Sequence, residues 1–482
     1  MKEDPIVAAR RVLDETFELF TTPAGEPFVV PRRGGRAVML TPKGEGKALG
    51  VLRLAAEGYS PRIPRSALVE ALTWAFDLAP QAAPSADLHL RAVRTRPDRI
   101  VIDLGELHSQ RCIVVTPKGW KVRDTPPKGV HFRLSRASRP LPEPQGGDGG
   151  KTMRTLLGWG KRDARWLVVR GWLAAASFSD IARPLLFPHG RAGSGKTTRA
   201  LAIASVFDPR DELGGALGKD ERDALVAAGA RFVVAWDNVT SVSVETSNFI
   251  CRLVTGGTDE RRSLFTDEDM YVRSIRRTGL ITGLSIPLLE PDALERILPI
   301  HCEAIRAADR VSEAGLRGEF AAAHPVILGA VLDDVVHVLR HLPKVREMTR
   351  ERPRQADYSD VLRALDPAID GAFQELTTDL VREVAESDPF VQAVVGWLRA
   401  AQSAGRLPLT MAPAEALVAI RASLPPGGRA DTWLPKTPAG LSTMLTKNAG
   451  PLAACGFSVS RKVRRGQKLD VYAPLPIERN RS

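Results

Sequence analysis

The chain has 482 residues, of which 44% are hydrophobic and 26% are charged, so it is long enough for two to four folded domains. This average composition excludes a chain that is disordered throughout and confines disorder to linkers and tails. The formal net charge of +12 favours a polyanionic partner such as nucleic acid, although arginine-rich surfaces also occur without one.

The cysteines and the apolar runs argue against two further classes of protein. No CxxC pair occurs among Cys112, Cys251, Cys302 and Cys455, which disfavours a zinc ribbon or a disulfide framework and fits a reducing cytoplasm. The charged start of the chain lacks the apolar core of a signal peptide. The longest apolar runs are interrupted by charges before they reach the ~20 residues that cross a bilayer. We expect a cytoplasmic protein without a membrane span.

Residues 1–138 predict an N-terminal α+β accessory domain, whose role the pattern does not indicate. A helix-like start at 5–20 precedes short strand-like runs at 99–104 and 112–115, which turn residues separate. The segment 139–152 is rich in proline and glycine and predicts a linker.

The rest of the chain changes pattern twice. In residues 153–304 apolar strands alternate with helical patterns, which predicts a three-layer α/β core with a parallel sheet. Residues 305–404 have apolar side chains at helical spacing and predict a helical domain. Residues 405–482 follow a proline-rich break and predict helices and then a β-hairpin that turns at 464–467.

A phosphate-binding loop opens the helix that follows the first strand of the α/β core. The residues from Gly190 to Thr197 match GxxxxGK[ST], between a strand-like run at 184–187 and a helical run at 198–206. Glycines allow backbone N–H groups to wrap around phosphates, while the lysine adds charge and the hydroxyl binds Mg²⁺. We therefore predict that ATP and Mg²⁺ are bound by Gly190, Gly193, Ser194, Gly195, Lys196, Thr197 and Thr198.

Two more strand ends add polar side chains to this predicted site. Asp237 ends the apolar run 232–236, where a carboxylate reaches a metal ion held by a neighbouring phosphate loop. A helix cap is the alternative role for this aspartate. Thr282 lies at the tip of the next strand, at 278–283, and could sense the γ-phosphate or orient water. Thr197 and Asp237 are the predicted metal ligands.

Three stretches carry a resemblance to a known family: Asp237–Ser241, Cys251–Gly257 and Arg262–Asp267. Together with the three strand ends, and with Thr255-Gly256-Gly257 between the second and the third, they resemble the superfamily 3 helicases of viruses and plasmids, a branch of the AAA+ ATPases. More closely, they look like the primase-helicase-like proteins of bacterial prophages and integrative elements. The resemblance implies a P-loop AAA+ core, with Lys196 and Thr197 in the Walker A motif and Asp237 in the Walker B motif.

The resemblance also implies an arginine finger and two departures from the superfamily pattern. Arg296 matches the arginine finger, which in a ring contacts the γ-phosphate bound to an adjacent subunit. The alternative for Arg296 is an ion pair with Asp292 or Glu295. Superfamily 3 members usually carry asparagine at the position of Thr282 and an acid at that of Asn238. An amide cannot take a proton but can orient water, so we expect a slow to moderate ATPase. The predicted catalytic residues are Lys196, Asp237, Asn238, Thr282 and Arg296.

Two basic regions are predicted to contact DNA. Superfamily 3 proteins build a pore-facing hairpin in the region that here contains Arg261, Arg262, Arg276 and Arg277, with ordinary surface arginines as the alternative. Residues 429–482 contain ten Lys or Arg and three acids. Thr437-Pro438 predicts a helix start, and the helices with the basic hairpin resemble a winged helix-turn-helix. The predicted contacts there are Lys447, Arg461, Lys462, Arg464, Arg465 and Lys468, with a protein-binding winged helix as the alternative.

These features predict an ATP-dependent DNA helicase or translocase that acts in the replication of a mobile element or prophage. The expected assembly is a homo-oligomeric ring such as a hexamer, with single-stranded DNA in its pore and duplex DNA at the winged helix. Replication proteins are further expected partners. One alternative is an ATP-switched DNA-binding loader or regulator with low turnover, and another is a small-molecule P-loop kinase.

Overall fold

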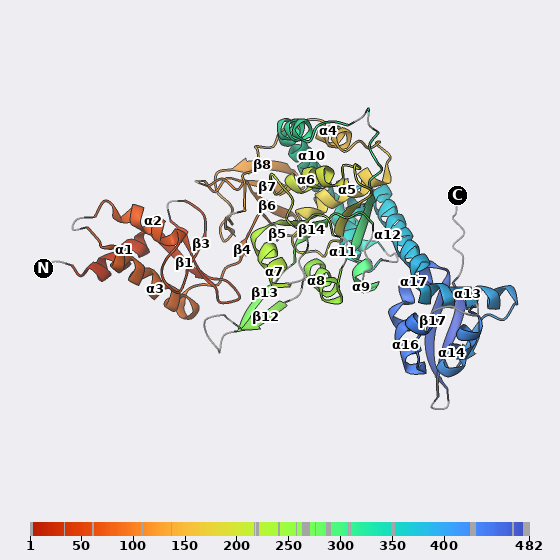
Figure 1. Cartoon of the computed structure of the whole chain (residues 1–482). Helices are drawn as coiled ribbons and strands as arrows, with labels where there is room; N and C mark the ends of the chain where they lie inside the picture. The colour runs from red at the N-terminus through yellow and green to blue at the C-terminus, as the bar shows by residue number, and fades with distance from the viewer. Residues whose placement is uncertain are drawn as a thin grey trace. The chain divides into compact units, whose positions relative to one another are not determined.

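The computed structural model describes residues 3–475 apart from 33, 60–61, 108, 136, 216, 218–220, 240–241, 257, 263–269, 275, 286–290, 307, 309, 349–351, 425–429 and 465–466. The chain divides into two compact units. The first comprises residues 1–240, 248–286 and 300–370, and the second comprises 241–247, 287–299 and 371–482. Figure 1 shows the order of helices and strands along the chain.

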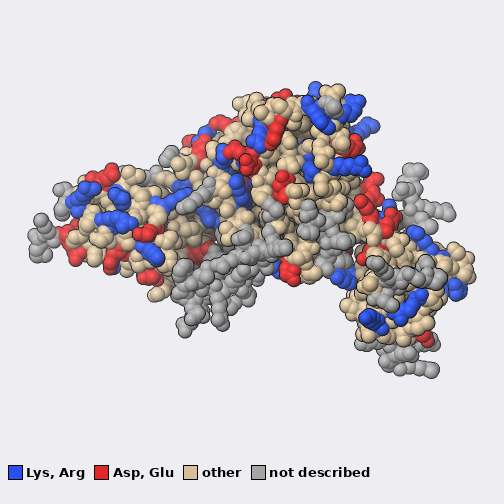
Figure 2. Space-filling model, viewed as in Figure 1, with Lys and Arg blue, Asp and Glu red and all other residues tan. Residues whose placement is uncertain are grey.

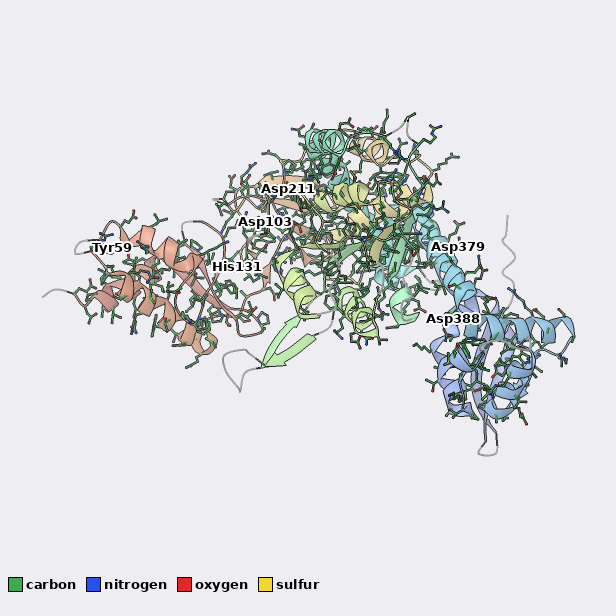
Figure 3. The ribbon with its side chains drawn as sticks, viewed as in Figure 1. Tyr59, Asp103, His131, Asp211, Asp379 and Asp388 are labelled. Carbon is green, nitrogen blue, oxygen red and sulfur yellow. The ribbon has the colours of Figure 1, made fainter. Side chains whose placement is uncertain are left out.

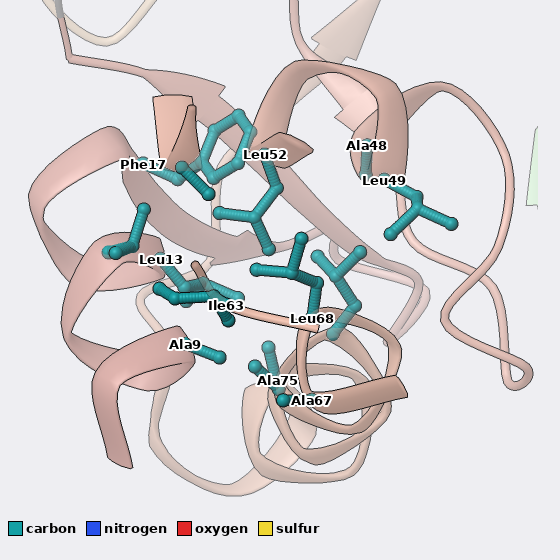
Figure 4. Packing of buried hydrophobic residues seen from close by; sticks show 14 of the residues in the cluster. Ala9, Leu13, Phe17, Ala48, Leu49, Leu52, Ile63, Ala67, Leu68 and Ala75 are labelled. Carbon is teal, nitrogen blue, oxygen red and sulfur yellow. The ribbon is translucent and has the colours of Figure 1, made fainter. Parts of the chain in front are cut away.

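Three helices and a small antiparallel sheet form the start of the first unit. Helix α1 (Pro5–Thr16) begins at Asp4, whose carboxylate accepts the Ile6 N–H at 2.7 Å. Helices α2 (Lys47–Ala56) and α3 (Arg65–Ala82) follow, and the sheet has the order β1 (Phe17–Thr21), β2 (Pro27–Pro31), β3 (Val38–Met39). Leu13, Phe17, Leu52 and Leu68 meet in one buried apolar cluster (Figure 4).

A second antiparallel sheet follows, with the order β5 (Ala92–Arg96), β6 (Arg99–Asp103), β7 (Cys112–Thr116), β8 (Gly119–Arg123). Strands β6 and β7 confirm the two strands expected here. Beside this sheet, β4 (Leu88–His89) pairs in parallel with β9 (His131–Phe132).

The segment expected to be a linker, 139–152, is packed into the first unit. Leu141 is 4% exposed, and the backbone N–H of Gln145 donates to the carbonyl oxygen of Pro325 at 2.9 Å. At Gly329, a Cβ atom would lie 1.9 Å from the carbonyl oxygen of Gln145. The prolines and glycines thus permit a close backbone approach rather than a free tether, which the composition does not distinguish.

The centre of the first unit is an α/β arrangement around a sheet with the order β11-β14-β10-β15. These strands are β10 (Leu185–His189), β11 (Val233–Trp236), β14 (Thr278–Ile281) and β15 (Ile297–His301). Both β10 and β11 pair in parallel with β14, and the three strands are buried as a parallel sheet between helices requires. The predicted parallel α/β architecture is therefore confirmed. The other elements of this region are α4 (Gly149–Leu156), α5 (Ala164–Ala176), α6 (Lys196–Ser205), α7 (Glu221–Ala230), α8 (Val244–Thr255), α9 (Pro291–Leu294) and the hairpin β12 (Thr258–Arg262) and β13 (Met270–Ser274).

Helix α10 (Glu313–Glu347) packs against α4 and against α11 (Ala356–Leu365), and α12 (Pro367–Ser387) follows. Within the part of the chain that the structure describes, α10 is the one helix whose length and hydropathy would suffice to cross a membrane. More than half of its most apolar window, 56%, is buried inside the protein. This burial is typical of the core helix of a folded unit.

The second unit has its own apolar core, which begins earlier than the predicted boundary at residue 405. Phe390, Val394 and Leu398 on α13 (Pro389–Ser403) are buried in the same cluster as Leu441 and Tyr472. Because the apolar face of α13 covers the elements that follow, this helix belongs with them. These elements are β16 (Leu409–Met411), α14 (Pro413–Ala422), α15 (Ala430–Trp433), α16 (Pro438–Lys447), α17 (Ala449–Ala454), β17 (Phe457–Arg464) and β18 (Gln467–Pro474).

The helix start expected at Thr437-Pro438 is confirmed. The Thr437 hydroxyl accepts the backbone N–H of Gly440 at 3.1 Å, and Pro438 is the first residue of α16. The expected hairpin is also present, because β17 pairs antiparallel with β18 from Phe457–Pro474 to Arg464–Gln467. Strand β16 joins the other edge of β18 and completes a sheet with the order β16-β18-β17.

Candidate nucleotide-binding site

The glycine-rich loop joins the central strand β10 to α6. Gly193 and Gly195 have φ angles of 76° and 67°, which are left-handed conformations that glycine adopts at little cost. At Gly190, a Cβ atom would lie 2.2 Å from the carbonyl oxygen of Cys302, so any side chain would displace the backbone. Lys196, Thr197 and Thr198 occupy the first turn of α6, where unpaired N–H groups and the helix dipole favour an anion.

The chain segment after β15 covers this loop. The Ile305 N–H donates to the carbonyl oxygen of Gly193 at 3.2 Å, and the Cys302 N–H donates to that of His189 at 2.7 Å. On the other side, Arg199 donates to the carbonyl oxygen of Leu157 at 2.8 Å and to that of Ser194, which ties α6 to the loop. The Ser194 hydroxyl is fully buried and has no hydrogen-bond partner. The loop is therefore held from both sides while one of its own polar groups is unpaired.

Asp237 meets Thr197 and Thr282 at the carboxyl end of the sheet. Its Oδ1 atom accepts the Thr197 hydroxyl at 3.1 Å and also accepts the hydroxyl of Thr282. The sheet order explains this convergence, because β14, which ends just before Thr282, lies between the strand of the loop and the strand that ends before Asp237. Parallel strands present their carboxyl ends at one edge, where open α/β sheets bind ligands.

The oxygen atoms of this cluster fit a magnesium ion. Neighbouring ligands of an octahedral Mg²⁺ ion lie about 2.9 Å apart, close to the 3.1 Å between Thr197 Oγ1 and Asp237 Oδ1. No group of three or more His, Cys, Asp or Glu side chains that could hold a metal occurs among the described residues. This is compatible with Mg²⁺, which typically takes one or two carboxylates and completes its shell with water and phosphate oxygens.

Asn238 is the one residue other than glycine with a positive φ, 55°, in the described part of the chain. Asparagine tolerates this left-handed conformation better than most residues. Its backbone N–H donates to the Thr282 hydroxyl at 3.0 Å, and the next N–H, of Val239, donates to the Thr282 carbonyl oxygen at 2.7 Å. Two hydrogen bonds to Thr282 thus fix the backbone turn at Asn238, and the side chain of Asn238 is exposed.

The structure adds His189 and Arg310 to this region, and neither was expected from the sequence. The His189 ring stacks on Phe187 and lies 5.2 Å from the ring of His301. Burial, with a smaller effect from His301, lowers the pKa of His189 to about 4, so the ring is neutral at physiological pH. The Arg310 guanidinium lies 3.7 Å from the point that a Cβ of Gly193 would occupy. His189 directly precedes the loop, which is the only sequence signal, and nothing in the pattern singles out Arg310.

Arg296 forms the ion pair that was considered as its alternative role. Its Nη1 atom lies 2.8 Å from a carboxylate oxygen of Asp292, one helical turn earlier, and the arginine side chain is 11% exposed. Arg296 belongs to the second unit, whereas the loop, Asp237 and Thr282 belong to the first. Its role as a finger toward a neighbouring subunit stays a prediction.

Two arginines that were predicted to contact DNA make backbone hydrogen bonds instead. Arg276 donates to the carbonyl oxygens of Thr255 at 2.9 Å and Asp180 at 2.7 Å. Arg277 donates to that of Ala228 at 2.8 Å. Thr255 and Ala228 lie in the last turns of α8 and α7, where carbonyl groups need donors, so these contacts are structural and give no support to a DNA-facing role. The side chains of Arg261 and Arg262 lie outside the described residues.

The basic hairpin of the second unit is described only in part. Arg461 donates to Asp470 across the hairpin at 3.1 Å, while Lys462 on β17 and Lys447 at the end of α16 are exposed. The side chains of Arg464 and Lys468 and the whole of Arg465 lie outside the described residues. Figure 2 shows Lys and Arg side chains mixed with acidic ones over the face in view, rather than one continuous basic band.

Comparison with known proteins bears on the first unit above all. Residues 155–378, slightly less than half of the chain, match the model of a family described as actinomycete integrative conjugative element replication protein. The match includes the phosphate loop, Asp237, Thr282 and Arg296, and it supports a replication protein of a mobile element. No match is found among the curated proteins.

Solved structures of the C-terminal region of NrS-1 align with most of the chain at low similarity. The alignment with an apo structure in the A form covers 98% of this chain and 100% of the NrS-1 chain, with 11% sequence identity and a TM-score of 0.41. A second apo structure has the same coverage, with 10% identity and a TM-score of 0.40. Scores at this level do not establish a common fold.

Proposed function

We propose that this chain is an ATP-dependent DNA helicase or translocase that acts in the replication of a mobile element. The observation that carries the ATPase part is the meeting of Thr197, Asp237 and Thr282 beside the phosphate loop. The family match over residues 155–378 supports the replication part, and a replication protein interacts with DNA. The order of the parallel strands supports a P-loop AAA+ core.

In this proposal each residue of the loop has a defined task. A bound ATP–Mg²⁺ complex supplies the phosphoryl group and the metal charge. The backbone N–H groups at the start of α6 bind the phosphates, Lys196 adds a positive charge, and Thr197 and Asp237 hold the metal. Asn238, whose turn Thr282 fixes, orients water with its amide.

The ring and the winged helix are further parts of the proposal. Arg296 would act on the nucleotide of an adjacent subunit after releasing the carboxylate and the backbone carbonyl oxygen of Asp292. The hairpin of β17 and β18 beside α16 and α17 supports a winged helix that binds duplex DNA. Single-stranded DNA would occupy the pore of the ring.

One observation favours a second candidate, an ATP-switched DNA loader or regulator with low turnover. Asn238 stands directly after Asp237, and an amide cannot accept the proton of an attacking water. Both candidates use the same nucleotide site and differ in turnover.

Phosphate release by the purified chain, measured with and without single-stranded DNA, tests the proposal. We expect release that DNA stimulates and that Lys196→Ala lowers by about 100-fold or more, because the lysine charge acts on the transferred phosphoryl group. Lys344→Ala, the same change at an exposed position of α10, is the matched control and should leave release unchanged.

The alternative outcomes separate the candidates. ATP-dependent retention of DNA without phosphate release would favour the switch over the motor. Release that is identical in the Lys196→Ala variant, or a chain that binds no ATP, would contradict the site itself. Mass measurement with and without nucleotide tests the ring, and a strictly monomeric chain under both conditions would contradict it.

A further inference from the structure

A cleft lies in the N-terminal part of the first unit and has no residue in common with the candidate nucleotide site. Its volume is about 360 Å³, within the range of pockets that hold small ligands. The walls come from β1, the end of β2, the segment 34–37 and the segment 125–132. Its polar and aromatic lining includes Glu18, Phe20, Arg32, Arg36, Lys128 and His131, of which Glu18 and Arg32 form an ion pair at 3.0 Å. Figure 3 labels His131 in the wall and Asp103, the partner of Arg36.

Arg36 brings an incompletely paired cation to this cleft. The residue is 8% exposed, and its guanidinium donates to the carbonyl oxygen of Glu106 at 3.0 Å and to a carboxylate oxygen of Asp103. Its third nitrogen, Nη2, is buried and has no hydrogen-bond partner, and the second oxygen of Asp103 has none either. Because Nη2 itself is not exposed, an anion in the cleft would be stabilised by the charge of the guanidinium group rather than by a hydrogen bond from this atom.

The charged side chains that line the cleft are three cations, Arg32, Arg36 and Lys128, and one anion, Glu18. Arg91, which is 2% exposed, lies near Asp103 and donates to the backbone carbonyl oxygens of Asp103 at 3.2 Å and of Arg139. The Asp103 carboxylate accepts a hydrogen bond from Arg36, and burial raises its pKa in spite of the charges of both arginines. The local field at the cleft therefore favours an additional negative charge.

The rest of the wall supplies one more cation and an aromatic surface. Lys128 is exposed, and no ion pair with another described residue is formed by its ammonium group. The His131 ring lies 4.7 Å from that of Phe20, which in turn stacks on Phe28 at 5.4 Å. Burial lowers the pKa of His131, which keeps this ring neutral and suited to stacking against a flat ligand.

We propose that this cleft binds a nucleotide unit, with its phosphate at Arg36 and Lys128 and its base against Phe20 and His131. Basic side chains next to aromatic rings are the combination that holds single-stranded nucleic acid without reading its sequence. The same chemistry suits a free nucleotide, so the ligand is either a unit of a single strand or a mononucleotide. The site would place a strand on the first unit independently of the basic hairpin of the second.

Hydrogen exchange of the full chain can locate such binding without measuring activity. The Lys196→Ala background removes nucleotide binding at the phosphate loop, and the ligands are a short oligothymidylate, thymidine monophosphate and an abasic strand of equal length. We expect the segment 125–132 to be protected by the oligothymidylate or by both thymidine ligands, and less by the abasic strand. Lys128→Glu should weaken this binding roughly tenfold, because one charge-assisted contact becomes a repulsion.

Lys118→Glu is the matched control, since it reverses the charge of an exposed lysine on the turn between β7 and β8, outside the cleft. It should leave the protection unchanged. Protection by the oligothymidylate alone assigns the site to a strand, and protection by both thymidine ligands assigns it to any nucleotide. No protection by either, equal protection by the abasic strand, or equal binding by Lys128→Glu would overturn the proposal. A finding that the wild-type chain does not hydrolyse ATP would leave the proposal for this cleft unchanged.

Discussion

Thr282 is hydrogen-bonded to both Asp237 and Asn238 in the candidate nucleotide site. Its hydroxyl donates to Asp237 Oδ1 and accepts the backbone N–H of Asn238 at 3.0 Å, and the residue is fully buried. One hydroxyl group can make both bonds because it is a donor and an acceptor at once. A hydroxyl group at this position therefore joins the carboxylate of Asp237 to the turn at Asn238.

Replacing Thr282 by valine keeps the shape of the side chain and removes both hydrogen bonds. We expect Thr282→Val to lower phosphate release by about tenfold or more and to cost about 1–3 kcal/mol of unfolding free energy, since a buried polar group is left unpaired. Thr282→Ser keeps the hydroxyl and should retain most of both. Turnover and urea denaturation of the two variants measure this, and equal turnover in the valine variant would remove Thr282 from the site.

At the scale of elements, the close contact between α10 and the segment 139–149 depends on Gly329. A Cβ atom there would lie 1.9 Å from the carbonyl oxygen of Gln145, which is far inside the van der Waals distance. Gly329→Ala should therefore destabilise the first unit by about 2 kcal/mol or more, because one backbone must move away from the other. Urea denaturation, followed by circular dichroism, gives the change in unfolding free energy.

The same helix provides a control for the effect of alanine on helix propensity. Gly318 lies on α10 with nothing within 4 Å of its added Cβ, so Gly318→Ala should stabilise the helix by about 0.5–1 kcal/mol. Opposite signs for the two substitutions are the expected result. If both variants are stabilised, the segment 139–149 does not pack on α10 in solution.

The elements that the sequence predicts best are those determined by a short, local sequence pattern. The phosphate loop, the strands β6, β7 and β10 and the cap at Thr437 each follow from a short pattern that fixes backbone geometry. The packing of 139–149 was missed because proline and glycine indicate a linker and a tight contact equally well. The contact of His189 with His301, and the position of Arg310, depend on residues far apart in the chain that only the folded sheet brings together.

At the scale of the whole molecule, the chain consists of two units, each with its own apolar core. The first contains the parallel sheet and the candidate nucleotide site, whereas the apolar cluster of the second uses residues between Ala385 and Tyr472. Half or more of the formal net charge of +12 falls in residues 429–482, within the second unit. Nucleotide binding and duplex DNA binding are thus expected to reside on separate parts of the chain.

A fragment of residues 371–482 should therefore fold alone and retain duplex binding. We expect a cooperative urea transition, and an affinity that falls with salt in proportion to the phosphate contacts made by the basic hairpin.

Lys462→Ala should reduce the slope of log affinity against log salt by about one, because one phosphate contact is lost. Arg382→Ala, which removes an exposed positive charge from α12 far from the hairpin in sequence, is the control and should leave the slope unchanged. A fragment without a transition, or duplex affinity that stays entirely with residues 1–370, would contradict this division, because the basic hairpin would then contribute no contacts to DNA.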